Sequence, residues 1–147
     1  MYEFPLQKVL DYRLQTEEKE QAYLAQVQRE AEKARLAFKT VEEDLKISQQ
    51  KYAALQKELQ MGETLQAYEY LSLLAERLQV YEHEMLKQEE RLQQQVKQTE
   101  KAMQERKIMD KLREKDYSRY HLQITQAEQR QTDEIARTLY LRQKANS

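Results

Sequence analysis

Residues 24–59 carry apolar side chains at alternating steps of three and four residues, the spacing of a coiled-coil helix. The series reads Leu24, Val27, Ala31, Ala34, Phe38, Val41, Leu45, Ser48, Tyr52, Leu55 and Leu59, and only Ser48 interrupts it. A mean spacing of about 3.5 residues places these side chains along one narrow stripe of a helix. Because such a stripe is buried only when another helix covers it, the pattern predicts a helix pair.

The covering helix is expected from the same chain, through one short turn. The sequence contains one glycine, Gly62, and one proline, Pro5, so there is room for about one tight turn. Gly62 can end a helix and Thr64 can cap the next one. We therefore predict a first helix over about residues 5–60, a turn at about 61–64 and a second helix over about 65–143. The expected fold is all-α, a single domain (1–147) forming a long antiparallel two-helix coiled-coil hairpin with a longer, overhanging C-terminal helix.

The second helix is expected to present its own seam, meaning the row of side chains that faces the partner helix. That seam reads Tyr68, Leu71, Ala75, Leu78, Glu82, Met85, Glu89, Leu92, Val96, Thr99 and Met103. After Met103 the apolar residues leave this row, which predicts a phase slip. In the first helix the repeat extrapolates back through Glu20, Glu17 and Arg13 to Leu10 and Leu6. This polar stretch has two open interpretations: a solvated helix end, or a segment that meets a polar partner.

Composition and charge limit the possible functions. Charged residues make up 35% and hydrophobic residues 39% of the 147 positions, and the net charge is −1. A sustained 3-4 spacing argues against disorder. The near-neutral charge gives no indication of a nucleic-acid partner or a membrane-surface helix, and no apolar run is long enough to span a bilayer. No cysteine is present, and no signal-peptide pattern opens the chain. We expect a soluble, intracellular protein.

Catalytic and metal chemistry are not expected. The two histidines, His83 and His121, are far apart on the second helix, and a single glycine cannot form a phosphate-binding loop. A two-helix hairpin also has no water-excluding pocket in which pKa values could be tuned. Basic residues between Arg106 and Arg119 alternate with acidic ones, which favours a solvated face over a nucleic-acid site. We therefore expect no enzyme, no metal and no cofactor.

Two surfaces exceed what the hairpin needs. A second row, Tyr70, Leu74, Arg77 and Tyr81, lies roughly a quarter turn from the seam and has the composition of an interface. The alternative is that this broad apolar arc helps to pack the hairpin tip. Beyond about residue 118 the second helix outruns the first, yet it still carries apolar side chains such as Tyr140. An unpaired amphipathic helix end is a candidate docking element.

Four segments of the chain match the pattern of a known family. They are Phe-Pro-Leu-Gln-Lys-Val-Leu-Asp-Tyr-Arg at residues 4–13, the acidic residues at 17–20, Tyr-Glu-Tyr-Leu at 68–71 and the ending at 128–136. Through them the chain resembles the FliJ family of the bacterial flagellar type III export apparatus. The resemblance implies a non-catalytic coiled coil similar to the central stalk of rotary ATPases. Its expected partners are the hexameric export ATPase (FliI-like), the export gate protein (FlhA-like) and export chaperones. It implies a cytoplasmic location, with peripheral membrane association through the export apparatus.

Two residue sets follow from this resemblance. The expected gate-binding residues are Tyr70, Leu71, Leu74, Leu78 and Tyr81. The expected contacts with the ATPase ring, at the terminal end, are Leu6, Leu10, Arg13, Tyr120, Ile124, Ile135 and Leu139. The alternative function is a generic coiled-coil tether or adaptor in another intracellular assembly.

Overall fold

The computed structural model describes residues 1–58 and 61–146. These residues form two helices, α1 (Gln7–Lys57) and α2 (Met61–Ala145), and contain no strand. The all-α helical hairpin predicted from the apolar repeat is therefore confirmed. The contacts divide the chain into unit 1, made of Met1–Glu17 and Ala102–Ser147, and unit 2, made of Glu18–Lys101. Each helix contributes to both units, which are described in turn.

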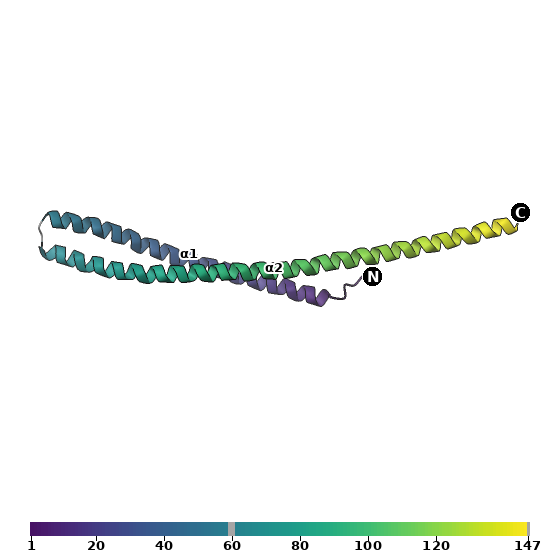
Figure 1. Ribbon diagram of the computed structural model, residues 1–147, viewed down its shortest axis with the longest axis horizontal. Helices are drawn as coiled ribbons and strands as arrows, with labels where there is room; N and C mark the ends of the chain where they lie inside the picture. Colours follow the sequence, from purple (N-terminus) through teal and green to yellow (C-terminus); the bar gives the residue numbers. More distant parts are fainter. Residues whose placement is uncertain (59–60, 147) are drawn as a thin grey trace. The chain divides into compact units, whose positions relative to one another are not determined.

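In unit 2, α1 and α2 run side by side in opposite directions (Figure 1). Contacts such as Arg35 with Glu89 and Tyr52 with Tyr68 fix this antiparallel pairing. Every stripe position from 24 to 55 is buried or half-buried, and Val27 and Ala31 are almost completely covered. The stripe therefore forms the α1 side of the helix interface, as predicted. Leu59, its last predicted member, lies outside the described residues.

The connection differs from the predicted turn at 61–64. α1 ends at Lys57 and α2 begins at Met61, so Gly62 and Thr64 lie in the first turns of α2. An acidic residue, Glu63, also lies in the first turn of α2, where it favours a helix start through the helix dipole. The earlier start moves the pairing by about one helical turn. The Tyr52 ring accordingly lies 6.3 Å from the Tyr68 ring, centroid to centroid, whereas a turn at Gly62 would have placed Tyr52 near Ser72.

The α2 seam also differs from the predicted one. In unit 2 the row of Ala67, Leu74, Gln88 and Gln95 is buried or half-buried, whereas Tyr68, Ala75 and Glu82 of the predicted row are exposed. Both rows share Leu71, Leu78, Met85, Leu92 and Thr99, and both have steps of three and four residues. The predicted row is therefore wrong at Tyr68, Ala75 and Glu82, and its other members are buried or half-buried. The prediction missed Gln88 and Gln95 because their side chains are polar.

In unit 1, residues 1–17 pack against α2 from Ala102 to Tyr120. Leu10 (1% exposed), Phe4 and Met109 form a small apolar core, with Tyr2 packed against it. The buried α2 positions Ala102 and Met109 continue the seven-residue spacing along the sequence, so the predicted phase slip after Met103 is wrong. From His121 to Asn146 every residue is exposed, so this segment, termed the overhang, has no covering helix within unit 1.

Neither helix, over its described residues, contains a stretch with the length and hydropathy needed to cross a bilayer.

Candidate interaction surfaces

Glu17 lies in the α1 seam of unit 1 and is neutralised by Arg106. Glu17 is only 7% exposed, and it accepts hydrogen bonds from Arg106 Nε (2.5 Å) and Nη2 (3.3 Å). Arg106 also donates from Nη1 to Asp110 at 2.7 Å. These bonds, first the one to Glu17, raise the pKa of Arg106 above its usual range. One turn earlier, Arg13 donates to Glu105 at 2.7 Å. The polar partner that the sequence left open is therefore α2 of the same chain.

Unit 2 contains a second polar section of the seam. Gln95 and Thr99 are 4% and 5% exposed, and both lie against the backbone carbonyl oxygen of Glu20. Gln95 Nε2 also donates to the Glu20 carboxylate. No buried side-chain nitrogen or oxygen among the described residues lacks a hydrogen-bond partner. Because burying an unpaired polar group is costly, this matching keeps the polar section compatible with a stable helix pair.

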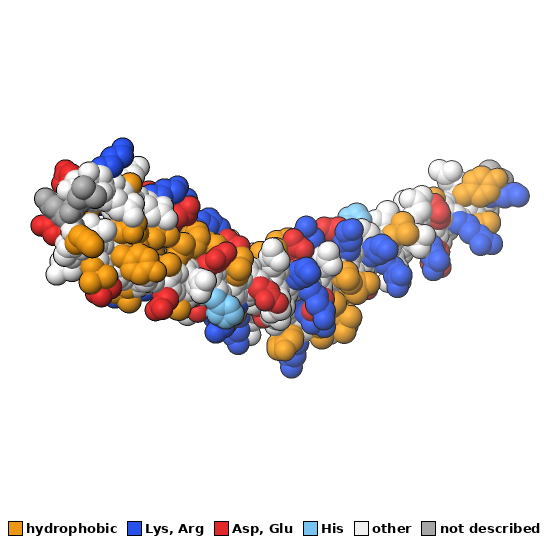
Figure 2. Space-filling view, turned by 60° about the vertical axis from the view of Figure 1, so that its left-hand side comes forward, with side chains coloured by type: hydrophobic (Ala, Val, Ile, Leu, Met, Phe, Trp, Pro, Cys, Tyr) orange, Lys and Arg blue, Asp and Glu red, His pale blue; other side chains and the backbone are white. Residues whose placement is uncertain are grey.

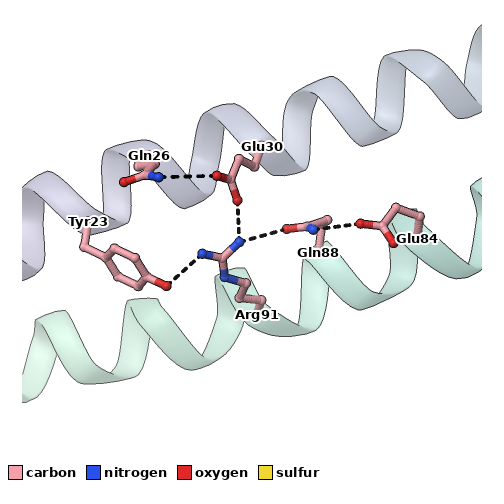
Figure 3. A network of polar contacts seen from close by, with 6 residues as sticks. All are labelled: Tyr23, Gln26, Glu30, Glu84, Gln88 and Arg91. Atoms are coloured by element: carbon pink, nitrogen blue, oxygen red, sulfur yellow. Dashed lines mark hydrogen bonds and ion pairs between the residues drawn. The ribbon is translucent and has the colours of Figure 1, made fainter.

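Arg91 links the two helices along one flank of unit 2 (Figure 3). Its guanidinium donates to the Tyr23 hydroxyl at 2.7 Å and to the Glu30 carboxylate, and it lies 5.5 Å from the Tyr23 ring centroid. The hydrogen bond to Tyr23 and that to Glu30 raise the pKa of Arg91. Gln88 extends the network to Glu84 at 2.9 Å. Tyr23 and Glu30 are seven residues apart, beside the stripe, which is the sequence signal that could have found them.

The N-terminal residues form a clip on α2. The Tyr2 ring lies 5.2 Å from the Tyr117 ring and 5.1 Å from the Tyr120 ring, and its hydroxyl donates to Asp116 at 2.7 Å. Partial burial and this hydrogen bond raise the pKa of Tyr2 to about 12. The sequence treated residues 1–5 only as a lead-in. The clip extends coverage of α2 as far as Tyr120.

An apolar groove lies at the connection end of unit 2, with a volume of about 720 Å³. Its lining comprises Tyr52, Gln56, Met61, Gly62, Thr64, Leu65 and Tyr68. Figure 2 shows hydrophobic side chains gathered at this end of the unit. A Cβ added to Gly62 would meet no atom within 4 Å, so the groove is open above the start of α2.

Comparison with known families identifies the chain. The family model of the flagellar FliJ protein matches residues 2–145. The chain belongs to the FliJ family. The resemblance noted from the sequence is thus confirmed, and FliJ proteins are non-catalytic components of flagellar protein export. No curated protein and no solved structure matches the chain significantly.

The five residues that the family resemblance predicts to bind the gate differ in their solvent exposure. Tyr70 and Tyr81 are 48% and 39% exposed, whereas Leu71 and Leu78 are half-buried in the seam. Leu74 is only 2% exposed. Its assignment to a surplus surface row is therefore wrong, because it is the best-buried α2 side chain in this part of the hairpin. Exposed Leu73 and Val80 lie on the same flank of α2 as Tyr70.

The residues expected to meet the ATPase ring fall into two groups in unit 1. Leu10 is buried and Arg13 is paired with Glu105, so both belong to the helix interface; Leu6 remains exposed. Tyr120 is half-buried under Tyr2. Three others, Ile124, Ile135 and Leu139, are 40–61% exposed on the overhang. The structure therefore does not bring the seven together as one surface.

The described residues contain no group of three or more His, Asp or Glu side chains arranged to hold a metal ion.

Proposed function

We propose that this chain is the stalk-like coiled coil of the flagellar export machinery. Its overhang inserts into the hexameric export ATPase and promotes ring assembly, and the hairpin links that ring to the export gate. The observation that carries this proposal is the overhang itself. It exposes Ile124, Ile135, Leu139 and Tyr140, which no described residue covers. Exposed apolar side chains at helical spacing are typical of a helix that docks onto another protein.

The charge of this region supports insertion into a protein ring rather than a membrane. The overhang itself contains four Lys and Arg and three Asp and Glu, within a longer stretch, residues 106–147, that contains ten and six. Figure 2 shows basic and apolar side chains interspersed with acidic and polar ones along the terminal part of α2. A mixed surface of this kind favours a partner that offers both apolar and acidic groups.

The gate-binding surface is proposed to be the exposed flank of α2 in unit 2, with Tyr70 and Tyr81 as its anchors. Large aromatic side chains that are partly exposed contribute strongly to protein interfaces. Leu71, Leu74 and Leu78 support this flank from the seam, since they pack under it rather than on it. Export chaperones are further proposed partners, and the protein is proposed to act in the cytoplasm, at the membrane-bound export apparatus.

The test is the ATP turnover and hexamer content of the cognate export ATPase, measured with and without this chain. We expect both to rise with the native chain and to return toward the basal level with Ile135→Ala and Leu139→Ala together. The control is Leu36→Ala with Ile47→Ala, which removes two equally exposed side chains (54% and 51%) from α1 in unit 2. An unchanged ATPase in the presence of the native chain would favour the alternative, a generic coiled-coil tether.

A further inference from the structure

Unit 1 exposes apolar side chains on one side of its helix pair. Leu6 directly precedes α1, Val9 and Tyr12 lie in the first turns of α1, and Ile108 and Leu112 lie in α2; each is 40–63% exposed. These positions flank the seam and take no part in the core of Phe4, Leu10 and Met109. A two-helix pair needs only its seam to be apolar, so this flank is surplus to the fold.

Leu6 and Leu112 meet in one groove, and Val9, Tyr12 and Ile108 extend the apolar face along their own helices. The groove has a volume of about 220 Å³, and its other lining residues are Phe4, Pro5, Lys115, Asp116 and Arg119. Leu6 is already in helical geometry, because its carbonyl accepts from Leu10 N at 3.0 Å. Val9 is therefore its neighbour at i+3, and Ile108 is the neighbour of Leu112 at i−4. We call this surface the unit 1 groove.

The walls of the unit 1 groove have coiled-coil spacing. On α2 the exposed row reads Ile108, Leu112, Lys115, Arg119 and Leu122, with steps of four and three residues. Two antiparallel helices whose flanking rows both carry such side chains present a groove that a third helix fits. The row therefore has the spacing of a second seam whose partner helix is not part of unit 1.

The charged residues of the unit 1 groove indicate what kind of helix it would bind. Lys115 and Arg119 interrupt the apolar row, and neither makes an ion pair with a described residue. One carboxylate, Asp116, also lines the groove, and it accepts the hydrogen bond from the Tyr2 hydroxyl. Asp110 and Glu105 lie earlier on α2 and pair with Arg106 and Arg13. Two unpaired cations between apolar side chains are complementary to a helix that carries carboxylates beside an apolar stripe.

We propose that the unit 1 groove binds an amphipathic helix of another protein, with Asp or Glu side chains of that helix pairing with Lys115 and Arg119. The groove shares only Leu6 with the residues proposed to meet the export ATPase, and the overhang variant Ile135→Ala with Leu139→Ala leaves it intact. Failure of one proposal is therefore distinguishable from failure of the other.

The experiment uses the full chain and two synthetic amphipathic helices of about 21 residues, about 30 Å long when helical. Both carry the same Leu and Ile stripe at 3-4 spacing; one has Glu and the other Lys at the flanking positions. Fluorescence anisotropy of labelled peptides gives the two dissociation constants. We expect the Glu peptide to bind about tenfold more tightly than the Lys peptide, as two partly exposed ion pairs allow.

The variant Lys115→Glu with Arg119→Glu should abolish or reverse this preference. The matched control is Lys97→Glu with Lys101→Glu, an exposed i, i+4 pair on α2 in unit 2, which should leave the preference unchanged. Leu112→Ala should weaken both peptides, and circular dichroism checks that each variant stays helical. Equal binding of the two peptides, or Glu-peptide binding that survives the Lys115 and Arg119 reversal, would overturn the proposal. Sedimentation showing a dimer of the native chain that this reversal dissociates would also overturn it, because a second copy would then occupy the groove.

Discussion

Arg106 binds both carboxylate oxygens of Glu17 across the helix interface of unit 1, and both residues occupy seam positions that an ordinary coiled coil would fill with apolar side chains. An apolar seam alone tolerates sliding by one heptad, because every heptad looks alike. A paired charge in the seam penalises such a shift, since each ion would lose its partner. We infer that this pair fixes the alignment of the N-terminal part of α1 on α2.

Reversing the charges of this pair gives the first prediction. Arg106→Glu places a second carboxylate beside Glu17, and Glu17→Arg places a second guanidinium beside Arg106, so each single change should lower the melting temperature. The double variant restores opposite charges and should recover part of the loss. Thermal unfolding followed by circular dichroism at low and high salt measures all three. Additive losses in the double variant would show that the two side chains are not coupled.

The second prediction concerns Leu74, Phe38 and Tyr70. Leu74→Ala should lower the free energy of unfolding by about 2–4 kcal/mol, because it empties a buried position. Phe38→Ala should cost about 1–3 kcal/mol, less than in a globular core because Phe38 is half-buried. Tyr70→Ala, at 48% exposure, should change stability by about 0.5 kcal/mol or less.

Urea unfolding of the three single variants measures these differences. Gate binding separates the roles further: Tyr70→Ala should weaken it without loss of stability, whereas Leu74→Ala should act through stability. A Leu74 variant as stable as the native chain would contradict the seam described for unit 2.

The third prediction concerns the pH dependence of the N-terminal clip. The pKa of Tyr2 rises from 10.0 to about 12 in the folded chain, so the fold favours the neutral phenol. The contribution of Tyr2 to stability is therefore complete below pH 10 and is lost as the pH rises through about 12. Tyr2→Phe keeps the ring contacts with Tyr117 and Tyr120 but removes the hydroxyl bonded to Asp116.

Spectrophotometric titration of the native chain and of Tyr2→Phe measures this directly. The difference between the two curves should be a single phenol ionising near pH 12. A difference centred near pH 10 would mean that the Tyr2 hydroxyl is not held by Asp116 in solution. Asp116→Asn supplies a second check, because loss of the carboxylate should move the Tyr2 step toward lower pH.

The two helix faces of unit 2 differ in how well the sequence predicts them, because their residues differ in polarity. The α1 stripe was predictable because almost every position of the 3-4 series from Leu24 to Leu55 is apolar. Only one face of the helix could therefore be buried. The α2 face was predicted only in part, because polar Gln88 and Gln95 also belong to the interface. The burial of Gln95 is explained by its hydrogen bonds to the backbone carbonyl and carboxylate of Glu20.

Other features depend on pairings that no local pattern contains. The sequence correctly placed Arg13 and Glu17 on the seam of the first helix, by extrapolating the apolar repeat. Their partners lie some ninety residues further along the chain. Tyr2 precedes α1, so no helical period could place it on Tyr117. The exposed overhang, by contrast, followed from helix lengths alone, because one helix is 51 residues long and the other 85.

The most direct test of the proposed stalk function is site-specific photo-crosslinking to the assembled export ATPase. A photoreactive residue placed at Ile135 on the overhang should crosslink to the ATPase. One placed at Leu65, in the apolar groove at the connection end of unit 2, should not. Both side chains are about equally exposed, at 61% and 60%, so accessibility does not bias the comparison. Crosslinks to the ATPase from Leu65 and none from Ile135 would contradict the assignment of the overhang as the part of the chain that enters the ring.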